Sequence, residues 1–150
     1  MCAAPELIWL NRQRAVSTRQ LRLPVVGDAV QRAWPDVAAV ARKGSVLRQL
    51  SEISFVLVSD TRIAALHDEF MCDPTPTDVI TFHHGEIVIS TETARREARA
   101  RGLPLSAEVA RYAVHGLLHL AGWSDDDAGA ASEMRSVQEK ILRLALRGLC

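Results

Sequence analysis

The sequence predicts an α+β fold, in which a small mixed sheet of four strands is packed with helices. Short runs rich in β-branched and aromatic residues predict the strands, and apolar residues repeating at helical intervals predict the helices. Proline, glycine and hydroxyl-bearing residues stand between these runs, where turns and helix caps are expected. The four strands are expected near residues 6–11, 52–59, 78–82 and 86–90.

Size and composition indicate an ordinary globular protein. The chain has 150 residues, of which 48% are hydrophobic and 24% charged, a balance that is not typical of disordered or fibrous proteins. A chain of this length can bury about two-thirds of its unfolded surface, so it needs no disulfide to fold. No internal repeat, low-complexity tract or linker composition interrupts it. We therefore expect a single domain over residues 1–150.

The cysteines and the N-terminal segment indicate a cellular compartment. Cys2, Cys72 and Cys150 are odd in number, far apart and without a Cys-x-x-Cys spacing. This pattern argues against a disulfide framework and for a reducing compartment. Glu6 stands where a secretory signal peptide would have its apolar run, and no stretch reaches membrane-spanning length. We therefore expect a cytoplasmic protein that does not associate with membranes.

The formal net charge is zero, but the charges are unevenly distributed. Residues 1–50 hold eight basic and three acidic groups, whereas residues 51–90 hold one basic and seven acidic groups. A neutral total therefore does not exclude an anionic partner such as RNA. A polar, solvated surface without any ligand explains the same pattern equally well.

The first half of the chain carries weak helix signals. Ser17 and Thr18 are candidate N-caps after the first strand. A helix is expected from Asp28 to Trp34. Pro35 should break or end it, because a proline inside a helix removes a backbone N–H and clashes with the preceding turn. A loosely defined helical turn is expected over residues 37–42.

The signal is clearer from residue 51 onward. Residues 52–59 become continuously apolar, as expected of a strand in the interior of a sheet. A short helix from Arg62 to Phe70 should follow, capped by Asp60 or Thr61.

Two adjacent histidines, His83 and His84, precede the last strand. Neighbouring side chains in an extended chain point to opposite faces, so the two cannot both join one site. We interpret them as surface or packing residues, with one of them lining a cleft as the alternative.

A polar helix capped by Thr91 is expected to run to about Arg101. Its arginines make it the best single candidate for a phosphate-facing surface: Arg95, Arg96, Arg99 and Arg101. Glu92 and Glu97 are interspersed among them, so a solvated helix is the simpler interpretation.

The most informative stretch is an apolar run that carries His115 and His119. If the run is helical, the four-residue step turns about 400° and advances about 6 Å, so both imidazoles leave one face a turn apart. Gly122 can adopt a positive φ, end the helix and turn the chain back. That turn brings Asp125 within reach of the two histidines.

Two histidines at helical spacing also occur by chance, and a buried imidazole in an ordinary helix is simply hydrogen-bonded. The glycine three residues on, the acid six residues on and the apolar surroundings favour a metal site over this alternative. Two imidazoles and a carboxylate leave the fourth position of a tetrahedral zinc ion open to water, which is typical of catalytic zinc. We therefore predict one Zn²⁺ ion held by His115, His119 and Asp125.

The same spacing parallels the extended zinc-protease motif, with one difference. Those enzymes carry a glutamate directly after the first histidine as general base, and here that position is Gly116. Peptide hydrolysis of that kind is therefore disfavoured. The sequence identifies no general base, because Asp126 and Asp127 are most simply explained as solvated acids after a turn.

Two helices complete the prediction. Ser106 should cap the helix that carries the histidines, which runs to about Ala121. The last helix should extend from about Ala130 to Leu146. Its apolar residues repeat at steps of three and four and form a stripe for packing: Met134, Val137, Ile141 and Leu144.

Residues 115–125, His-Gly-Leu-Leu-His-Leu-Ala-Gly-Trp-Ser-Asp, resemble the signature His-Gly-x-Leu-His-Leu-x-Gly-Tyr-Asp-His of the YbeY endoribonucleases. Residues 76–82, Pro-Thr-Asp-Val-Ile-Thr-Phe, are similar to the family's Pro-Thr-Asp-Val-Leu-Ser-Phe. The resemblance covers roughly residues 52–127 and implies the same architecture.

This resemblance implies a single-strand-specific, metal-dependent endoribonuclease. The family matures the 3′ end of 16S ribosomal RNA and contributes to ribosome quality control. The implied partners are ribosomal RNA and the small ribosomal subunit, and no DNA is expected.

The sequence departs from the family pattern at two positions. Asp125 stands in place of the third metal-binding histidine, and a carboxylate is an acceptable zinc ligand. Met71 stands in place of an arginine thought to act on the RNA, and it offers neither a cation nor a planar fork for phosphate. Both departures favour an alternative function, a ribosome-associated assembly or binding protein with a mainly structural metal and little or no nuclease activity.

Overall fold

The computed structural model describes residues 3–147, and Cys2 and Cys150 lie outside this range. Its centre is a four-stranded sheet with the order β1-β2-β4-β3. The strands are β1 (Glu6–Asn11), β2 (Glu52–Val58), β3 (Val79–Phe82) and β4 (Glu86–Ser90). All four lie where the sequence predicts them, and the α+β class is confirmed.

Six α-helices and one 3₁₀ turn pack around this sheet. They are α1 (Thr18–Leu21), α2 (Leu23–Ala39), the 3₁₀ turn η1 (Leu47–Gln49), α3 (Asp60–Met71), α4 (Thr91–Arg101), α5 (Leu105–Leu120) and α6 (Ala128–Ala145). Among residues 3–147, none of these helices combines the length and the apolar character that crossing a bilayer requires. Cys72, just after α3, is an exposed free thiol.

The sheet is mixed, as predicted. β1 pairs with β2 and β2 with β4 in parallel, whereas β3 runs antiparallel to β4. β2 therefore lies in the interior of the sheet, which explains why its sequence is continuously apolar.

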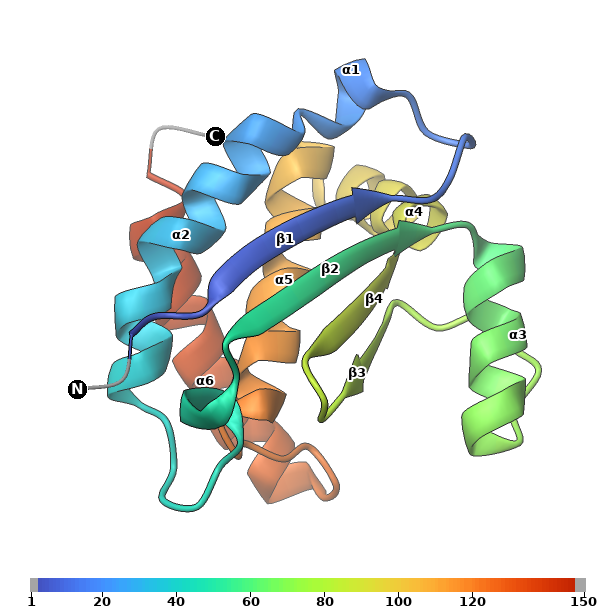
Figure 1. Ribbon diagram of the computed structural model, residues 1–150. Coiled ribbons are helices and arrows are strands. Elements are labelled where there is room, and N and C mark those ends of the chain that lie inside the picture. The colour runs from blue at the N-terminus through green and yellow to red at the C-terminus, as the bar shows by residue number, and fades with distance from the viewer. Residues whose placement is uncertain (1–2, 148–150) are drawn as a thin grey trace.

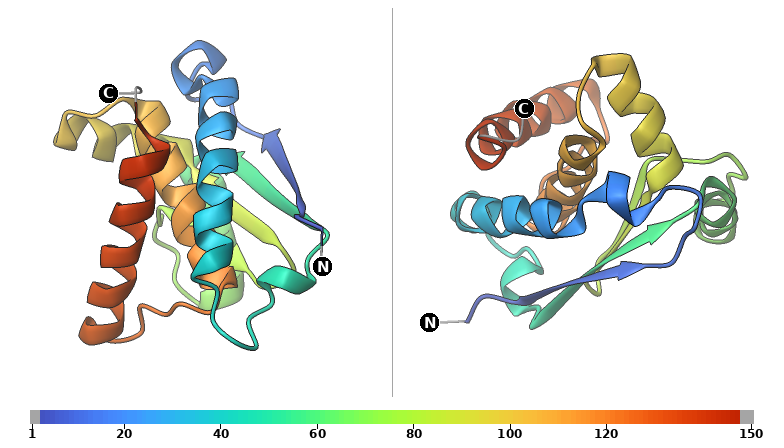
Figure 2. Two further views of the ribbon diagram at one scale, coloured as in Figure 1. Left: turned by 90° about the vertical axis from the view of Figure 1, so that its left-hand side faces the viewer. Right: turned by 90° about the horizontal axis from the view of Figure 1, so that it is seen from above.

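Helices cover the two faces of the sheet unequally. Figures 1 and 2 show α2, α5 and α6 gathered on one side, where they share a large apolar core with β2 and β4. On the opposite face, Ile63 of α3 packs against Ile80 and Val88 in a smaller apolar cluster. Helix α5 lies between the sheet and the outer helices, and most of its side chains are buried.

A close contact at Gly116 sets the distance between α5 and the sheet. A Cβ atom at this position would lie 2.7–3.0 Å from three carbon atoms of the Ile87 side chain, closer than real Cβ contacts allow. Glycine is therefore required where the helix backbone approaches β4. The predicted helix that carries the two histidines is confirmed, and this contact fixes which of its faces is turned toward the sheet.

The prediction that Pro35 ends a helix is wrong. Helix α2 is continuous from Leu23 to Ala39, with Pro35 inside it and Pro24 in its first turn, where a missing N–H costs nothing. Ala33 and Val37, on either side of Pro35 in the sequence, are fully buried. Their burial outweighs the single hydrogen bond that the proline removes.

Several predicted helix caps are displaced toward the N-terminus by one or two residues. The Oγ atoms of Ser59 and Ser90 cap α3 and α4, in place of the neighbouring residues predicted for this role. Pro104, rather than Ser106, stands at the N-cap of α5. Helix α6 begins at Ala128, two residues earlier than predicted, because Asp127 accepts a hydrogen bond from the backbone N–H of Ala130.

The contact at Gly116 leads to a prediction for stability. Gly116→Ala should lower the free energy of unfolding by about 1–2 kcal/mol in urea titrations, since overpacking costs more than the gain in helix propensity returns. Gly129→Ala is the control, because its Cβ would meet only Asp127 Oδ1 at 3.4 Å. Adding Ile87→Ala should make the combined loss smaller than the sum of the single losses. A stability unchanged by Gly116→Ala would contradict the contact.

Candidate metal centre

The structure brings the three residues predicted as metal ligands together. The Nε2 atoms of His115 and His119 lie 3.1 Å apart, and each lies 3.5 Å from Asp125 Oδ2. Among residues 3–147, these three form the one group of His, Cys, Asp or Glu side chains whose ligand atoms all lie within 4.8 Å of one another. The arrangement could therefore hold a metal ion.

Helix α5 and the turn after it position these ligands. His115 and His119 leave the same face of α5 near its C-terminal end, with 25% and 24% of their side chains exposed. Gly122 adopts a φ of +92°, and its N–H donates to the carbonyl of His119 at 3.0 Å. This turn carries the chain back so that Asp125 faces the two imidazoles, as the sequence predicts.

Two acceptors hold the outer nitrogens of the imidazoles. His115 Nδ1 lies 2.7 Å from Gln138 Oε1, and His119 Nδ1 lies 3.1 Å from the carbonyl oxygen of Trp123. Both oxygens can only accept, so each Nδ1 carries the proton and each Nε2 of a neutral ring presents a lone pair. This is the arrangement in which metal-bound histidines are commonly found.

The donor set fits a cation. Two Nε2 lone pairs and a carboxylate oxygen converge within hydrogen-bonding range, but with both rings neutral none of them has a proton to donate. Burial lowers the pKa of His119, and neighbouring His115 lowers it further, which favours the neutral imidazole that metals require. Two imidazoles and one carboxylate are a common ligand set for zinc.

The carbonyl that orients His119 is itself held in place. The indole Nε1 of Trp123 donates to the carbonyl of Val40 at 3.0 Å, and the guanidinium of Arg42 lies 4.1 Å from the centre of the indole ring. The turn between α5 and α6 therefore contacts the end of α2, and these contacts help to hold the candidate ligands in position.

A hollow of about 140 Å³ opens beside the histidines, between α5 and α6. His115, Asp125, Arg135 and Gln138 are among the residues that line it. The guanidinium of Arg135 forms no ion pair with any other residue of the described range. The hollow is thus a small polar space with a cation at its rim.

The other residues singled out in the sequence lie elsewhere. Met71 is 54% exposed at the end of α3. His83 and His84 are exposed at the β3–β4 turn, and the His84 ring stacks on Phe82, which confirms their interpretation as surface and packing residues. Asp127 has a structural role as the N-cap of α6.

Sequence reasoning missed Gln138. It lies 23 residues after His115 on the last helix, which the sequence indicates only as a packing element. Gln138 is a polar residue on the buried, mainly apolar face of α6. This break in the apolar pattern is the sequence signal that could have indicated its role.

Comparison with known proteins identifies the family. A family model described as Endoribonuclease YbeY matches residues 16–145. The chain belongs to the YbeY family. The predicted resemblance is thereby confirmed, and it extends well beyond the metal-binding stretch.

Curated YbeY proteins resemble the chain over most of its length. A Gluconobacter oxydans protein named Endoribonuclease YbeY is 37% identical over 128 residues, which cover 81% of this chain and 74% of the relative. A Synechococcus protein of the same name is 38% identical over 135 residues, covering 78% of this chain and 81% of the relative. A solution structure of a Thermotoga maritima protein matches 93% of this chain and 89% of its own with a TM-score of 0.62. At 22% identity it supports the fold alone.

The role of Gln138 can be tested by metal affinity. Gln138→Leu leaves the Nδ1–H of His115 without its acceptor and should weaken zinc binding about 10- to 100-fold, as measured by competition with a chromophoric chelator. Gln138→Glu is the matched control, because it keeps an acceptor and should bind zinc at least as tightly as the unchanged protein. Equal zinc affinity in the leucine variant would show that the hydrogen bond does not orient the ligand.

Proposed function

We propose that this chain is a metal-dependent endoribonuclease that cleaves single-stranded RNA. The observation that carries the proposal is the convergence of His115, His119 and Asp125 at the end of α5 in a chain of the YbeY family. Its relatives bear the name endoribonuclease, which gives the class of reaction. The three side chains give a place for the metal.

Zinc is the ion that this donor set suits best, because borderline-soft imidazole nitrogens predominate over a single carboxylate. A bound zinc ion supplies Lewis acidity for the hydrolysis of a phosphodiester. His115 and His119 would hold the ion from one face of α5, and Gln138 and the Trp123 carbonyl keep their rings turned toward it. Asp125 adds a negative charge that a third histidine would not, so it lowers the net positive charge of the site.

Arg135 is the residue of the site best placed to meet a phosphate. It lines the hollow beside His115 on the exposed side of α6 and has no carboxylate partner in the described range. A free guanidinium can donate two parallel hydrogen bonds to phosphate oxygens. In this role Arg135 would supply a positive charge in place of the family arginine, whose position is taken here by Met71.

Peptide hydrolysis is a poorer match to the same residues. The position that holds the general base of the zinc proteases is Gly116, which packs against Ile87 with no room for a side chain. A glutamate could not be placed at this position without moving α5 away from Ile87.

The biological setting of the proposal follows the family. We infer a cytoplasmic enzyme, acting as a single unit over residues 1–150, whose substrate is ribosomal RNA. Maturation of the 3′ end of 16S ribosomal RNA and ribosome quality control, with the small subunit as partner, are its proposed tasks. It is proposed to require neither DNA nor a membrane.

One observation favours a second candidate function. Met71, in place of the family arginine, is an exposed and uncharged side chain at the end of α3. A protein with a structural metal that binds the ribosome without cutting RNA would not need a cation there.

Metal analysis combined with cleavage assays tests the proposal. Protein purified without added metal should contain about one equivalent of zinc and cut single-stranded ribosomal RNA fragments. His119→Ala and Asp125→Ala should lose the zinc, and cleavage should fall on the order of a thousandfold as the charge stabilisation by the metal disappears. His84→Ala, a change at an exposed histidine that is not part of the candidate ligand group, should retain both properties.

The outcomes separate the two candidate functions. Zinc in the unchanged protein without metal-dependent cleavage would support the ribosome-binding function. A purified protein without bound zinc, and without zinc affinity when the metal is added back, would overturn the metal site itself.

Arg135 gives an independent prediction. Arg135→Ala should slow cleavage about ten- to a hundredfold without loss of zinc, because a group that stabilises phosphate charge is removed while the ligands remain. Arg143→Ala removes an exposed arginine two turns further along α6 and serves as the control. Equal cleavage rates in the two variants would exclude a role for Arg135.

A further inference from the structure

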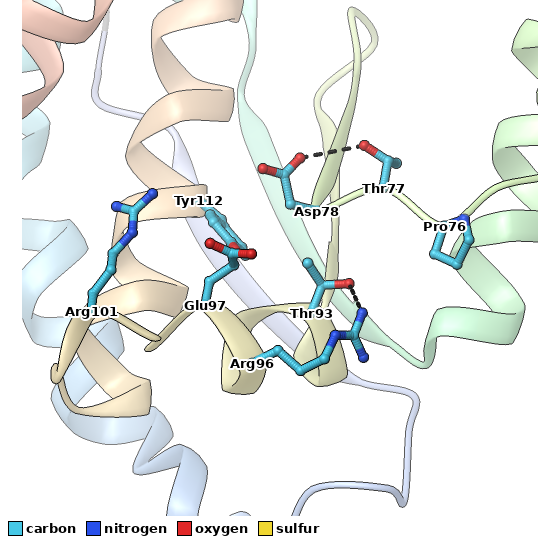
Figure 3. Close-up of a pocket in the computed structure, with 8 residues that line it drawn as sticks. All are labelled: Pro76, Thr77, Asp78, Thr93, Arg96, Glu97, Arg101 and Tyr112. Atoms are coloured by element: carbon cyan, nitrogen blue, oxygen red, sulfur yellow. Dashed lines mark hydrogen bonds between the residues drawn. The ribbon is translucent and has the colours of Figure 1, made fainter. Parts of the chain in front are cut away.

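A second and larger polar hollow, of about 470 Å³, lies between α4, α5 and the segment before β3. Figure 3 shows its side chains, which come from three separate parts of the chain and face a common space. The volume lies within the range of about 300–1,000 Å³ that small-molecule sites occupy. Nothing in the proposed metal chemistry uses this hollow.

Tyr112 is the buried polar residue that lines this hollow. Tyr112 is only 5% exposed, and its hydroxyl has no hydrogen-bond partner among the described residues. Leaving a buried hydroxyl unpaired is unfavourable, so it is expected where a ligand supplies the partner. The hydroxyl can both donate and accept.

Each of the two arginines of the hollow has an acidic neighbour, but only Arg96 is hydrogen-bonded to it. Arg96 forms an ion pair with Asp60 at 2.8 Å, and Asp60 also accepts hydrogen bonds from Ser90 and Thr93. Arg101 lies 3.8 Å from the fully buried carboxylate of Glu108. Asp60 therefore neutralises Arg96, whereas Arg101 shares the charge of Glu108 with Arg111 and donates no hydrogen bond in the described range.

The two acids that face the hollow have carboxylate oxygens that accept no hydrogen bond within the described range. Glu97 on α4 forms no hydrogen bond or ion pair with other residues of the range 3–147. Asp78 uses Oδ1 to accept from the backbone N–H of Val79 at 2.8 Å, which leaves Oδ2 free. The hollow thus offers free carboxylate oxygens as acceptors beside the guanidinium N–H donors of Arg101.

We propose that this hollow binds an unpaired nucleobase that carries an exocyclic amino group, as a subsite for the single-stranded RNA substrate. The base would donate its amino protons to Glu97 and Asp78 and meet the hydroxyl of Tyr112. This inference rests on the proposed function, because it takes RNA to be the substrate. It names the part of the RNA that the hollow recognises.

A phosphate group matches the hollow less well. It would meet two carboxylates that repel an anion, and of the two guanidinium groups that of Arg96 is already engaged by Asp60. A cationic side chain of a peptide would suit the carboxylates, but the guanidinium of Arg101 would repel it and favours a neutral ligand that carries both donors and acceptors. An adenine, cytosine or guanine base has this character.

The position of the hollow relative to the metal centre supports a shared substrate. Tyr112 precedes His115 by three residues and His119 by seven, so the three side chains leave α5 on the same side within about two turns. One RNA strand lying along this side of α5 could contact both. The base would then fix which phosphodiester bond lies at the metal.

Binding of short oligonucleotides tests the subsite. Oligocytidylate and oligoadenylate carry the amino group, and oligouridylate of equal length does not. Fluorescence anisotropy in the presence of a chelator, which prevents metal-dependent cleavage, should show about tenfold tighter binding of the first two, as expected for hydrogen bonds to a charged group.

Two conservative variants should reduce this preference to less than about threefold. Glu97→Gln removes the negative charge of the acceptor, and Tyr112→Phe removes the hydroxyl. Glu69→Gln, which makes the same charge change at an exposed position on α3, should leave the preference intact. Tyr112→Phe should also raise the midpoint of thermal unfolding by about 2–4 °C, because the unpaired hydroxyl is gone.

Two results would overturn the subsite. One is equal affinity of the unchanged protein for all three oligonucleotides, and the other is a preference that persists in both Glu97→Gln and Tyr112→Phe. Glu97-dependent binding of a lysine peptide, with oligonucleotide binding unaffected, would assign the hollow to a protein ligand instead. A base preference that survives in a protein without cleavage activity would overturn the nuclease function but not the subsite.

Discussion

The candidate metal centre depends on the contact between α5 and the sheet. At Gly116 the helix backbone lies directly on the Ile87 side chain, which fixes the rotation of α5 about its axis. Successive residues of a helix are turned by about 100°, so fixing residue 116 against the sheet directs His115 away from it. His119 follows one turn later on the same side. A larger residue at 116 would move or rotate the helix, and with it both ligands.

The sequence could predict that the three candidate ligands would meet because their geometry is local. His115, His119 and Asp125 span eleven residues, and helical spacing followed by a glycine turn is sufficient to bring them together. The hydrogen bond that His115 Nδ1 donates to Gln138 is different, since it depends on how α6 packs against α5. A pattern within one helix carries no information about which residue of another helix will face it.

Helix boundaries were less predictable for a related reason. Ser90 is the last residue of β4 and pairs with Val58 of β2, and it is also the N-cap of α4. Whether Ser90 or Thr91 caps the helix depends on where strand pairing ends, which the neighbouring strand decides. The continuity of α2 through Pro35 likewise depends on burial against the rest of the core, and local propensity alone favours a break.

Helix α5 carries more polar groups than its buried position requires. Glu108, Tyr112, His115 and His119 succeed one another at steps of three and four on a helix whose other faces are apolar. Neither carboxylate oxygen of Glu108 has a hydrogen-bond partner in the described range, and burial raises its pKa, but the guanidinium groups of Arg101 and Arg111 lie 3.8 and 3.6 Å away and oppose that rise. Glu108 is thus paired within the protein, whereas the unpaired Tyr112 hydroxyl and the converging histidines are better explained by ligands than by packing. Because one rigid helix presents both the metal ligands and the proposed base subsite, a change in the tilt of α5 would displace the two together, whereas a change on α6 would act on the metal centre alone.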